Sequence, residues 1–195
     1  PDFALPYAGI ANVCAQYHHH YQREITWMER ANTAARRAAA LRPDLPEVQV
    51  AQAWILYTDK KYEDAIRCAQ LAIDRKRDCE GAYYILGRAL FASGRYQEIA
   101  GMADAALEAS GDDYNVYVPI NNALGALGKG EALRNVRQRR ILALENHLKL
   151  VPDDARARTH LAGDYVAADR GEDAVREMQF AVALRPNDAH VLYNA

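Results

Sequence analysis

One cluster in the sequence has the residue types of a metal site: the run His18-His19-His20, with Cys14 one helical turn before it. Cys14 and His18 are four residues apart, so on a helix their sulfur and nitrogen atoms would share a face, and Zn²⁺ accepts both ligands. No second ligand pair with the spacing of a structural zinc site occurs elsewhere in the sequence. We therefore interpret the histidines as an exposed loop between helices, and we predict no metal and no cofactor.

A glycine-rich segment, GALGKG at residues 125–130, superficially resembles a phosphate-binding loop. It lacks the pattern GxxxxGK[ST], and no strand precedes it that could aim a set of backbone amides at a phosphate group. We interpret this segment as a turn between two helices.

A basic stretch lies on a long helix predicted over residues 131–150 and contains Arg134, Arg137, Arg139 and Arg140. Arg137 is three residues from both Arg134 and Arg140, so these three share a helix face. Such a face could recognise an anionic partner. It could equally be a solvated outer face, and this is the interpretation we favour.

Catalytic arrangements are missing from the sequence. We find no Ser-His-Asp, Cys-His or paired-carboxylate pattern, and the acidic residues fall mostly in turns and on expected outer faces. His160 and Asp164 form an i, i+4 pair, but a single helical pair of this kind is common and unspecific. We predict that the chain is not an enzyme.

The composition favours a soluble, all-α protein. Of 195 residues, 50% are hydrophobic and 26% are charged, which is enough to build a core and excludes intrinsic disorder. A net charge of −2 argues against a nucleic-acid partner, and no run of 18 apolar residues could insert into a membrane. Three cysteines without a CxxC pair favour a reducing compartment, so we expect a cytoplasmic location.

The chain also repeats itself. Three windows of 34 residues, 46–79, 80–113 and 155–188, share a small residue at the eighth position and alanine at the twenty-seventh. Two longer windows, 4–45 and 114–154, carry about two extra helical turns or an enlarged loop, and residues 189–195 match half of a further first helix. The small residues at these two positions are Ala53, Gly87, Ala162, Ala72, Ala106 and Ala181.

Within each window the apolar residues recur with the period of a helix. Ser93-Gly94-Arg95 interrupts the third window as a turn, and Pro43, Pro152 and Pro186 end helices because proline lacks an amide donor. Each window is therefore predicted to be an antiparallel pair of helices. One pair cannot bury enough apolar surface alone, so neighbouring pairs must stack.

This pattern resembles the tetratricopeptide repeat (TPR). The matches are an aromatic at position four, Leu-Gly at seven and eight, tyrosine at eleven, alanine at twenty and proline at thirty-two. The residues are Tyr7, Tyr83, Tyr117, Leu86, Gly87, Tyr165, Ala31, Ala65, Ala174, Pro43, Pro152 and Pro186. The resemblance covers the whole chain and implies a single α-α superhelix of about five stacked hairpins over residues 1–195.

The two ends of the sequence suggest a longer protein. Pro1-Asp2 fills the last positions of a preceding repeat, and the opening PDFALPYAG is similar to arrays attached to bacterial adenylate cyclases and Ser/Thr kinases. We therefore expect a segment of a bacterial protein whose open ends allow self-association.

The resemblance also implies where a ligand binds. In this family the second, fifth, ninth and twelfth residues of each first helix, with their neighbours, face a concave groove. The corresponding residues here are Asn12, Trp54, Tyr84, Arg88, Phe91, Asn115, Asn122, Arg156, Thr159 and His190. A known subclass grips a C-terminal carboxylate, but of its residues only the asparagine at Asn122 is present, so we do not expect that clamp.

Pro119 falls where a regular first helix would be under way, so this helix either starts near Val118 or is kinked. Taken together, the sequence predicts a non-catalytic scaffold that binds a peptide or helix of a partner protein in the groove. The alternative is a regulatory or oligomerisation segment of a larger enzyme, such as a bacterial kinase or adenylate cyclase.

Overall fold

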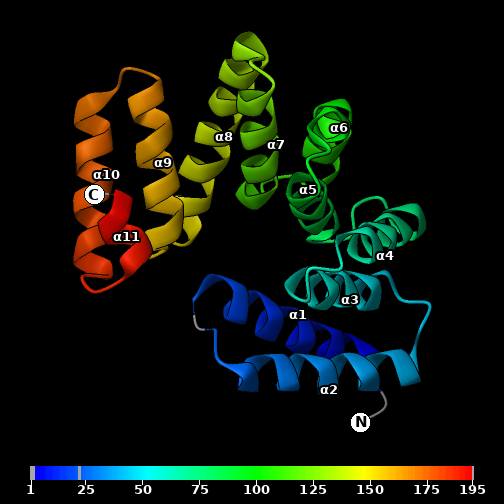
Figure 1. The fold of residues 1–195 in the computed structure, drawn as a ribbon. Coiled ribbons are helices and arrows are strands. Elements are labelled where there is room, and N and C mark those ends of the chain that lie inside the picture. The colour runs from blue at the N-terminus through cyan, green and yellow to red at the C-terminus, as the bar shows by residue number, and fades with distance from the viewer. Residues whose placement is uncertain (1–2, 22, 195) are drawn as a thin grey trace. The chain divides into compact units, whose positions relative to one another are not determined.

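The computed structural model describes residues 3–21 and 23–194, without the side chains of His190 and Asn194. Over these residues it contains eleven α-helices, one short 3₁₀ helix and no strand, so the prediction of an all-α fold is confirmed (Figure 1). The chain divides into two compact units, Pro1–Ser110 and Gly111–Ala195.

The first unit consists of three helical hairpins that follow one another along the chain (Figure 1). The pairs are α1 (Ala4–His20) with α2 (Ile25–Leu41), α3 (Pro46–Thr58) with α4 (Tyr62–Arg75), and α5 (Ala82–Ala92) with α6 (Tyr96–Ala109). Helix α3 packs against α1 and α2, and α5 packs against α3 and α4. The first helices α1, α3 and α5 therefore lie in sequence along one side of this unit.

Small residues make this stacking possible. Val48 of α3 packs against Ala8 of α1 and Ala38 of α2, and all three are buried. The small positions predicted from the repeat are also buried, with Ala53, Ala72 and Ala106 each at 0% exposure. A methyl group at these places lets neighbouring backbones approach closely, as ridges fit into grooves between packed helices.

Two glycines occupy backbone conformations that other residues rarely adopt. Gly81 precedes α5 with φ at 75°, and a Cβ atom there would lie 3.7 Å from Cγ1 of Val50. Gly128, with φ at 65°, forms the turn before α8. The segment 125–130 is therefore the end of α7, a turn and the start of α8, as predicted, and not a phosphate loop.

The histidine run corrects one expectation. Residues 18–20 are not an exposed loop; they form the last turn of α1, which extends for 17 residues. After Pro6 and Gly9, no proline or glycine occurs before His20. The ring centroids of Tyr17 and of Trp27 on α2 lie 4.6 Å apart. Much of the extra length of the window 4–45 is therefore helix.

The second unit contains two further hairpins, a short 3₁₀ helix and a short α-helix (Figure 1). Its elements are η1 (Tyr114–Val116), α7 (Tyr117–Ala126), α8 (Gly130–Leu150), α9 (Ala155–Ala167), α10 (Gly171–Leu184) and α11 (Ala189–Asn194). Helix α7 packs on α8, α8 on α9, and α9 on α10, while α11 contacts both α9 and α10. Val191 of α11 packs against Ala155 and Ala181, which repeats the arrangement of Val48 in the first unit.

Pro119 explains why the first helix of this unit is short. The chain enters through η1, and α7 begins only at Tyr117, so Pro119 is its third residue. The amides of the first helical turn have no partner within the helix, and a residue without an N–H is tolerated there. Of the two alternatives, the late start is confirmed.

Candidate functional site

The first helices of the first unit bring six polar and aromatic side chains together. His19 and His20 come from the end of α1, Trp54 and Tyr57 from α3, and Tyr84 and Arg88 from α5. These helices are neighbours in the stack, so residues from three repeats meet although up to 69 positions separate them in sequence (Figure 1). We call this set the aromatic–arginine cluster.

Trp54 forms the floor of the cluster. Its ring is fully buried, and the ring centroids of Tyr84 and Tyr57 lie 5.5 and 5.9 Å away in edge-to-face arrangements. The imidazoles of His19 and His20 lie at 5.9 and 6.0 Å from it. Such tilted packing suits the quadrupoles of aromatic rings and gives a rigid base.

Arg88 is the centre of the polar contacts. Its Nη2 atom lies 2.6 Å from Nε2 of His19 and donates to the hydroxyl of Tyr57 at 3.1 Å. Its Nη1 atom donates to the hydroxyl of Tyr84 at 3.4 Å. The guanidinium carbon also lies 5.5 Å above the Tyr57 ring and 5.8 Å above the Tyr84 ring, within the range of cation–π attraction.

The chemistry of Arg88 fixes the state of its neighbour. A guanidinium has five N–H donors and no acceptor, so Nε2 of His19 must accept this hydrogen bond through a lone pair. The cluster as folded therefore holds a permanent positive charge against a histidine ring that acts as an acceptor. His19, His20, Tyr57 and Arg88 are all partly exposed, so a ligand can reach them.

The structure places the predicted groove residues of the first unit in two groups. Trp54, Tyr84 and Arg88 meet in the cluster, but Trp54 and Tyr84 are 0% and 3% exposed and so support the surface from beneath. Asn12 instead accepts a hydrogen bond from Gln16 on the same helix, at 2.9 Å. Phe91 packs against Tyr96 of α6, with 4.9 Å between the ring centroids, and it does not belong to the cluster.

Three cluster residues were missed by the sequence analysis. Tyr57 is the twelfth residue of its window, which is a groove position in the family, so this signal was present. His19 and His20 were missed because the histidine run was interpreted as a loop. If the helix had been predicted to continue to residue 20, His19 and His20 would have been predicted to lie beside the first helices of the next two repeats.

In the second unit, two of the predicted residues meet. Arg156 of α9 donates to Oδ1 of Asn115 in η1, and its guanidinium carbon lies 5.9 Å above the Tyr114 ring. Thr159 is buried, with its hydroxyl donating to the carbonyl of Ala155, and Asn122 is exposed on α7. The side chain of the remaining predicted residue, His190, lies outside the described residues.

Asp154 anchors this region to α8. Its Oδ2 atom accepts a hydrogen bond from the Tyr114 hydroxyl at 3.1 Å and lies 2.9 Å from Nε2 of His147. Burial opposes ionisation of the carboxyl, but the Ala157 amide and the side chains of His147 and Tyr114 outweigh it and lower the pKa of Asp154. The arrangement holds Asp154 as a helix cap.

The basic stretch on α8 is not uniformly solvated, which corrects the interpretation that we favoured. Arg140 makes a bidentate ion pair with Asp164 of α9, and the two side chains are 11% and 1% exposed. Arg134 and Arg139 are exposed, as a solvated face requires. Asp164 thus pairs across the interface between α8 and α9.

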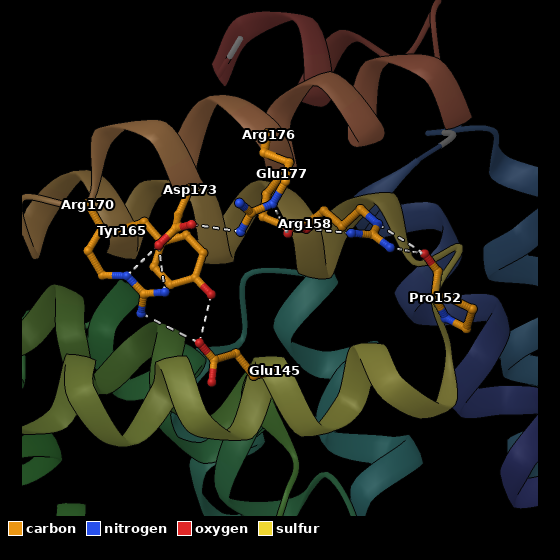
Figure 2. A network of polar contacts seen from close by, with 8 residues as sticks. All are labelled: Glu145, Pro152, Arg158, Tyr165, Arg170, Asp173, Arg176 and Glu177. Atoms are coloured by element: carbon orange, nitrogen blue, oxygen red, sulfur yellow. Dashed lines mark hydrogen bonds and ion pairs between the residues drawn. The ribbon is translucent and has the colours of Figure 1, made fainter.

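A second polar network joins α8, α9 and α10 (Figure 2). The hydroxyl of Tyr165 donates to Oε1 of Glu145 at 2.7 Å, and Arg170 lies between Glu145 and Asp173. Burial, followed by this hydrogen bond, raises the pKa of Tyr165 to about 12. Arg158 completes the network by pairing with Glu177 and donating to the carbonyl of Pro152. We interpret these contacts as structural.

Within the described chain, no group of three His, Cys, Asp or Glu side chains is arranged to hold a metal ion. Cys14 is buried, and Nδ1 of His18 lies 3.0 Å from the carbonyl oxygen of Glu24. None of the described helices is sufficiently long and apolar to span a bilayer.

Comparison with known proteins gives the fold its name. No protein-family model and no curated protein matches the sequence. Among solved structures, the chain is similar to TTC0263, described as a thermophilic TPR protein of Thermus thermophilus, with a TM-score of 0.65 and 17% identity over 96% of this chain and 95% of that one. The chain has the TPR fold.

Two further structures show the same TPR fold. YrrB, described as a TPR protein with an unusual peptide-binding site, has a TM-score of 0.52 and 16% identity over 98% of this chain and 91% of that one. The MamA protein has a TM-score of 0.51 and 17% identity over 94% of each chain.

Proposed function

We propose that the chain is a non-catalytic scaffold that binds a peptide or helix of a partner protein on the first-helix face of its first unit. The observation that carries this proposal is the aromatic–arginine cluster, in which α1, α3 and α5 present partly exposed imidazole, phenol and guanidinium groups over a buried tryptophan. Aromatic and arginine side chains are the residues that contribute most binding energy at protein interfaces.

The geometry supports a peptide ligand in particular. Tyr57 and Tyr84 are held by Arg88, and Trp54 is fixed beneath them, so little side-chain freedom would be lost on binding. YrrB, which has the same fold, is described by its peptide-binding site. The predicted residues Asn12, Phe91, Asn115, Asn122, Arg156, Thr159 and His190 stay in the proposal as further groove positions.

Composition supports the remaining parts of the proposal. A net charge of −2 favours a protein partner over nucleic acid. Cys14, Cys68 and Cys79 are free thiols, which fits a cytoplasmic location. We further propose that the windows 4–45, 46–79, 80–113, 114–154 and 155–188 act as one array in a bacterial protein.

Selection of random peptides on the intact chain tests this function. The selected peptides should protect backbone amides of α1, α3 and α5 from hydrogen exchange, and Tyr57→Ala should weaken their binding at least about tenfold. Phe180→Ala, which removes an exposed ring from the second helix α10, is the matched control and should bind normally. Failure to select any peptide, or protection confined to other helices, would refute the proposal.

The alternative role, an oligomerisation segment, is favoured by a different observation. A groove of about 560 Å³ lies along α9 and α10 and is lined by Thr159, Ala162, Gly163, Val166, Ala174, Val175, Met178, Gln179, Val182 and Ala183. Beside this groove, Val191 of α11 packs against α9 and α10. Val48 of the first helix α3 packs against α1 and α2 in the same way. The groove therefore has the shape that accepts a first helix.

We assign a second copy of this chain to the groove. Its α1 is a first helix on which the apolar side chains of Ile10 and Val13 are 50% and 64% exposed in the described chain. Sedimentation should show concentration-dependent association that Val175→Glu abolishes, while Val13→Glu does the same from the other side. A chain that stays monomeric at all concentrations would exclude this role.

A further inference from the structure

We infer that the ligand of the aromatic–arginine cluster presents a carboxylate to Arg88. This inference rests on the proposed peptide-binding function and specifies the chemistry of the segment that binds. It depends on how this arginine differs from two shielded arginines of the second unit, Arg140 and Arg158.

Two arginines of the second unit that are withdrawn from solvent are each neutralised by an acidic side chain. Arg140, 11% exposed, pairs with Asp164, and Arg158, 14% exposed, pairs with Glu177. Pairing is expected because a charge that loses water needs a compensating charge and hydrogen bonds. Both pairs join neighbouring helices, so they are part of the packing.

Arg88 is partly buried and has no such acidic partner among the described residues. Its contacts are the hydroxyls of Tyr57 and Tyr84 and the ring nitrogen of His19, none of which carries a negative charge at neutral pH. The other side chain in the group, His20, is also either neutral or cationic. Arg88 is therefore a positive charge that the cluster itself leaves without a counter-charge.

The surrounding groups suit a carboxylate. A guanidinium matches the two oxygens of a carboxylate with two parallel hydrogen bonds. The Tyr57 hydroxyl accepts from Arg88 and keeps its own proton to donate. The indole N–H of Trp54, the buried ring of the cluster, has no hydrogen-bond partner among the described residues. Such unsatisfied donors are rare in folded proteins.

A peptide is the ligand that brings this chemistry to a face of stacked helices, and its carboxylate comes from an Asp or Glu side chain or from its C-terminus. The side chain is our assignment, because a segment that lies across three successive first helices places interior residues, and not only its end, at the cluster. Random peptides with amidated C-termini, selected on the intact chain, are the probe.

Selected peptides should carry an acidic residue at a fixed position. Its replacement by the amide, Glu→Gln in the peptide, should weaken binding to the wild-type chain about ten- to a hundredfold, as expected for loss of a charged hydrogen bond. Against Arg88→Gln the same replacement should change the affinity by less than about twofold. Arg36→Gln, which removes an exposed charge from the second helix α2, is the matched control and should behave as wild type.

The other outcomes separate the two proposals. An equal loss on wild type and on Arg88→Gln would place the acidic contact elsewhere and overturn the inference. Peptides that bind α1, α3 and α5 without an acidic residue would also overturn it while leaving the binding function intact. A second library with free C-termini separates the two carboxylate sources: peptides selected only from it would replace the side-chain source by the terminal carboxylate. If neither library gives a peptide, both proposals fail. Circular dichroism of Arg88→Gln shows whether weaker binding is caused by misfolding. The conservative variant Arg88→Lys keeps the positive charge but loses the forked pair of N–H donors, and it is measured in the same way.

Discussion

The ion pair between Arg140 and Asp164 gives a sharp prediction about stability. The carboxylate is 1% exposed and accepts two hydrogen bonds from a guanidinium that is 11% exposed, across the interface of α8 and α9. Asp164→Asn removes the negative charge and leaves Arg140 shielded from water without compensation. Loss of one partner of a buried pair costs about 3–5 kcal/mol, so we expect the free energy of unfolding to fall by that amount.

Urea unfolding followed by circular dichroism measures this loss, and hydrogen exchange locates it in α8 and α9. Both tryptophans, Trp27 and Trp54, lie in the first unit, so fluorescence reports separately on that unit. Asp153→Asn removes the same charge from an exposed position just before α9 and should change stability by less than about 0.5 kcal/mol.

A double variant completes the test. Arg140→Met with Asp164→Leu removes both charges and should recover most of the stability, because apolar residues of similar size can replace a buried pair without loss. The reasoning is refuted if Asp164→Asn costs less than about 1 kcal/mol, or if the double variant is no more stable than the single one. Either result would mean that water reaches Arg140 in the folded chain.

Two other predictions concern the second polar network and the turn before α5. Because the pKa of Tyr165 is raised to about 12 in the folded state, its contribution to stability is complete below about pH 10, the value of a free phenol, and disappears as the pH rises towards 12. Unfolding curves between about pH 9 and 12 should show a smaller fall in Tyr165→Phe than in wild type, because Tyr117 and Cys79 also have raised pKa values. The variant should itself cost about 1 kcal/mol at neutral pH. Gly81→Ala places a Cβ on a backbone with φ at 75° and should destabilise the first unit by about 1–2 kcal/mol in thermal unfolding, whereas Gly101→Ala, within α6 and with open space at its Cβ, should not. Equal stability of the two glycine variants would contradict the strain argument.

Most of the fold could be predicted from the repeat pattern, because each hairpin depends on properties that are local to its own window. Small residues at the eighth and twenty-seventh positions, prolines after second helices and glycines at turns each act within one window. These signals predicted the helix pairs, and Pro119 left a late start or a kink as the two alternatives, of which the structure shows the late start at Tyr117. Their physical causes, backbone geometry and close packing, are the same in every repeat.

The candidate site was harder to predict because it depends on contacts between repeats. Arg88 could be assigned to the first-helix face, but its neighbour His19 lies 69 residues away, and their contact requires the length of α1 to be known. Burial of Trp54 and Tyr84 likewise follows from three helices meeting. Arg140 was misjudged for the same reason, since its partner Asp164 belongs to the next helix.

Because α1 is one continuous helix, the number of residues in it decides where His19 and His20 lie, and so whether the cluster can bind a ligand. Each residue turns a helix by about 100°, so a single insertion between Cys14 and His19 would swing both imidazoles away from Arg88 even if every side chain of the cluster were retained. An insertion or deletion that leaves the composition unchanged but alters the length of α1 would therefore abolish ligand binding by the aromatic–arginine cluster. Chains that share the surface should be recognised by the spacing of their histidines from the alanines of α1, and less by how many histidines they contain.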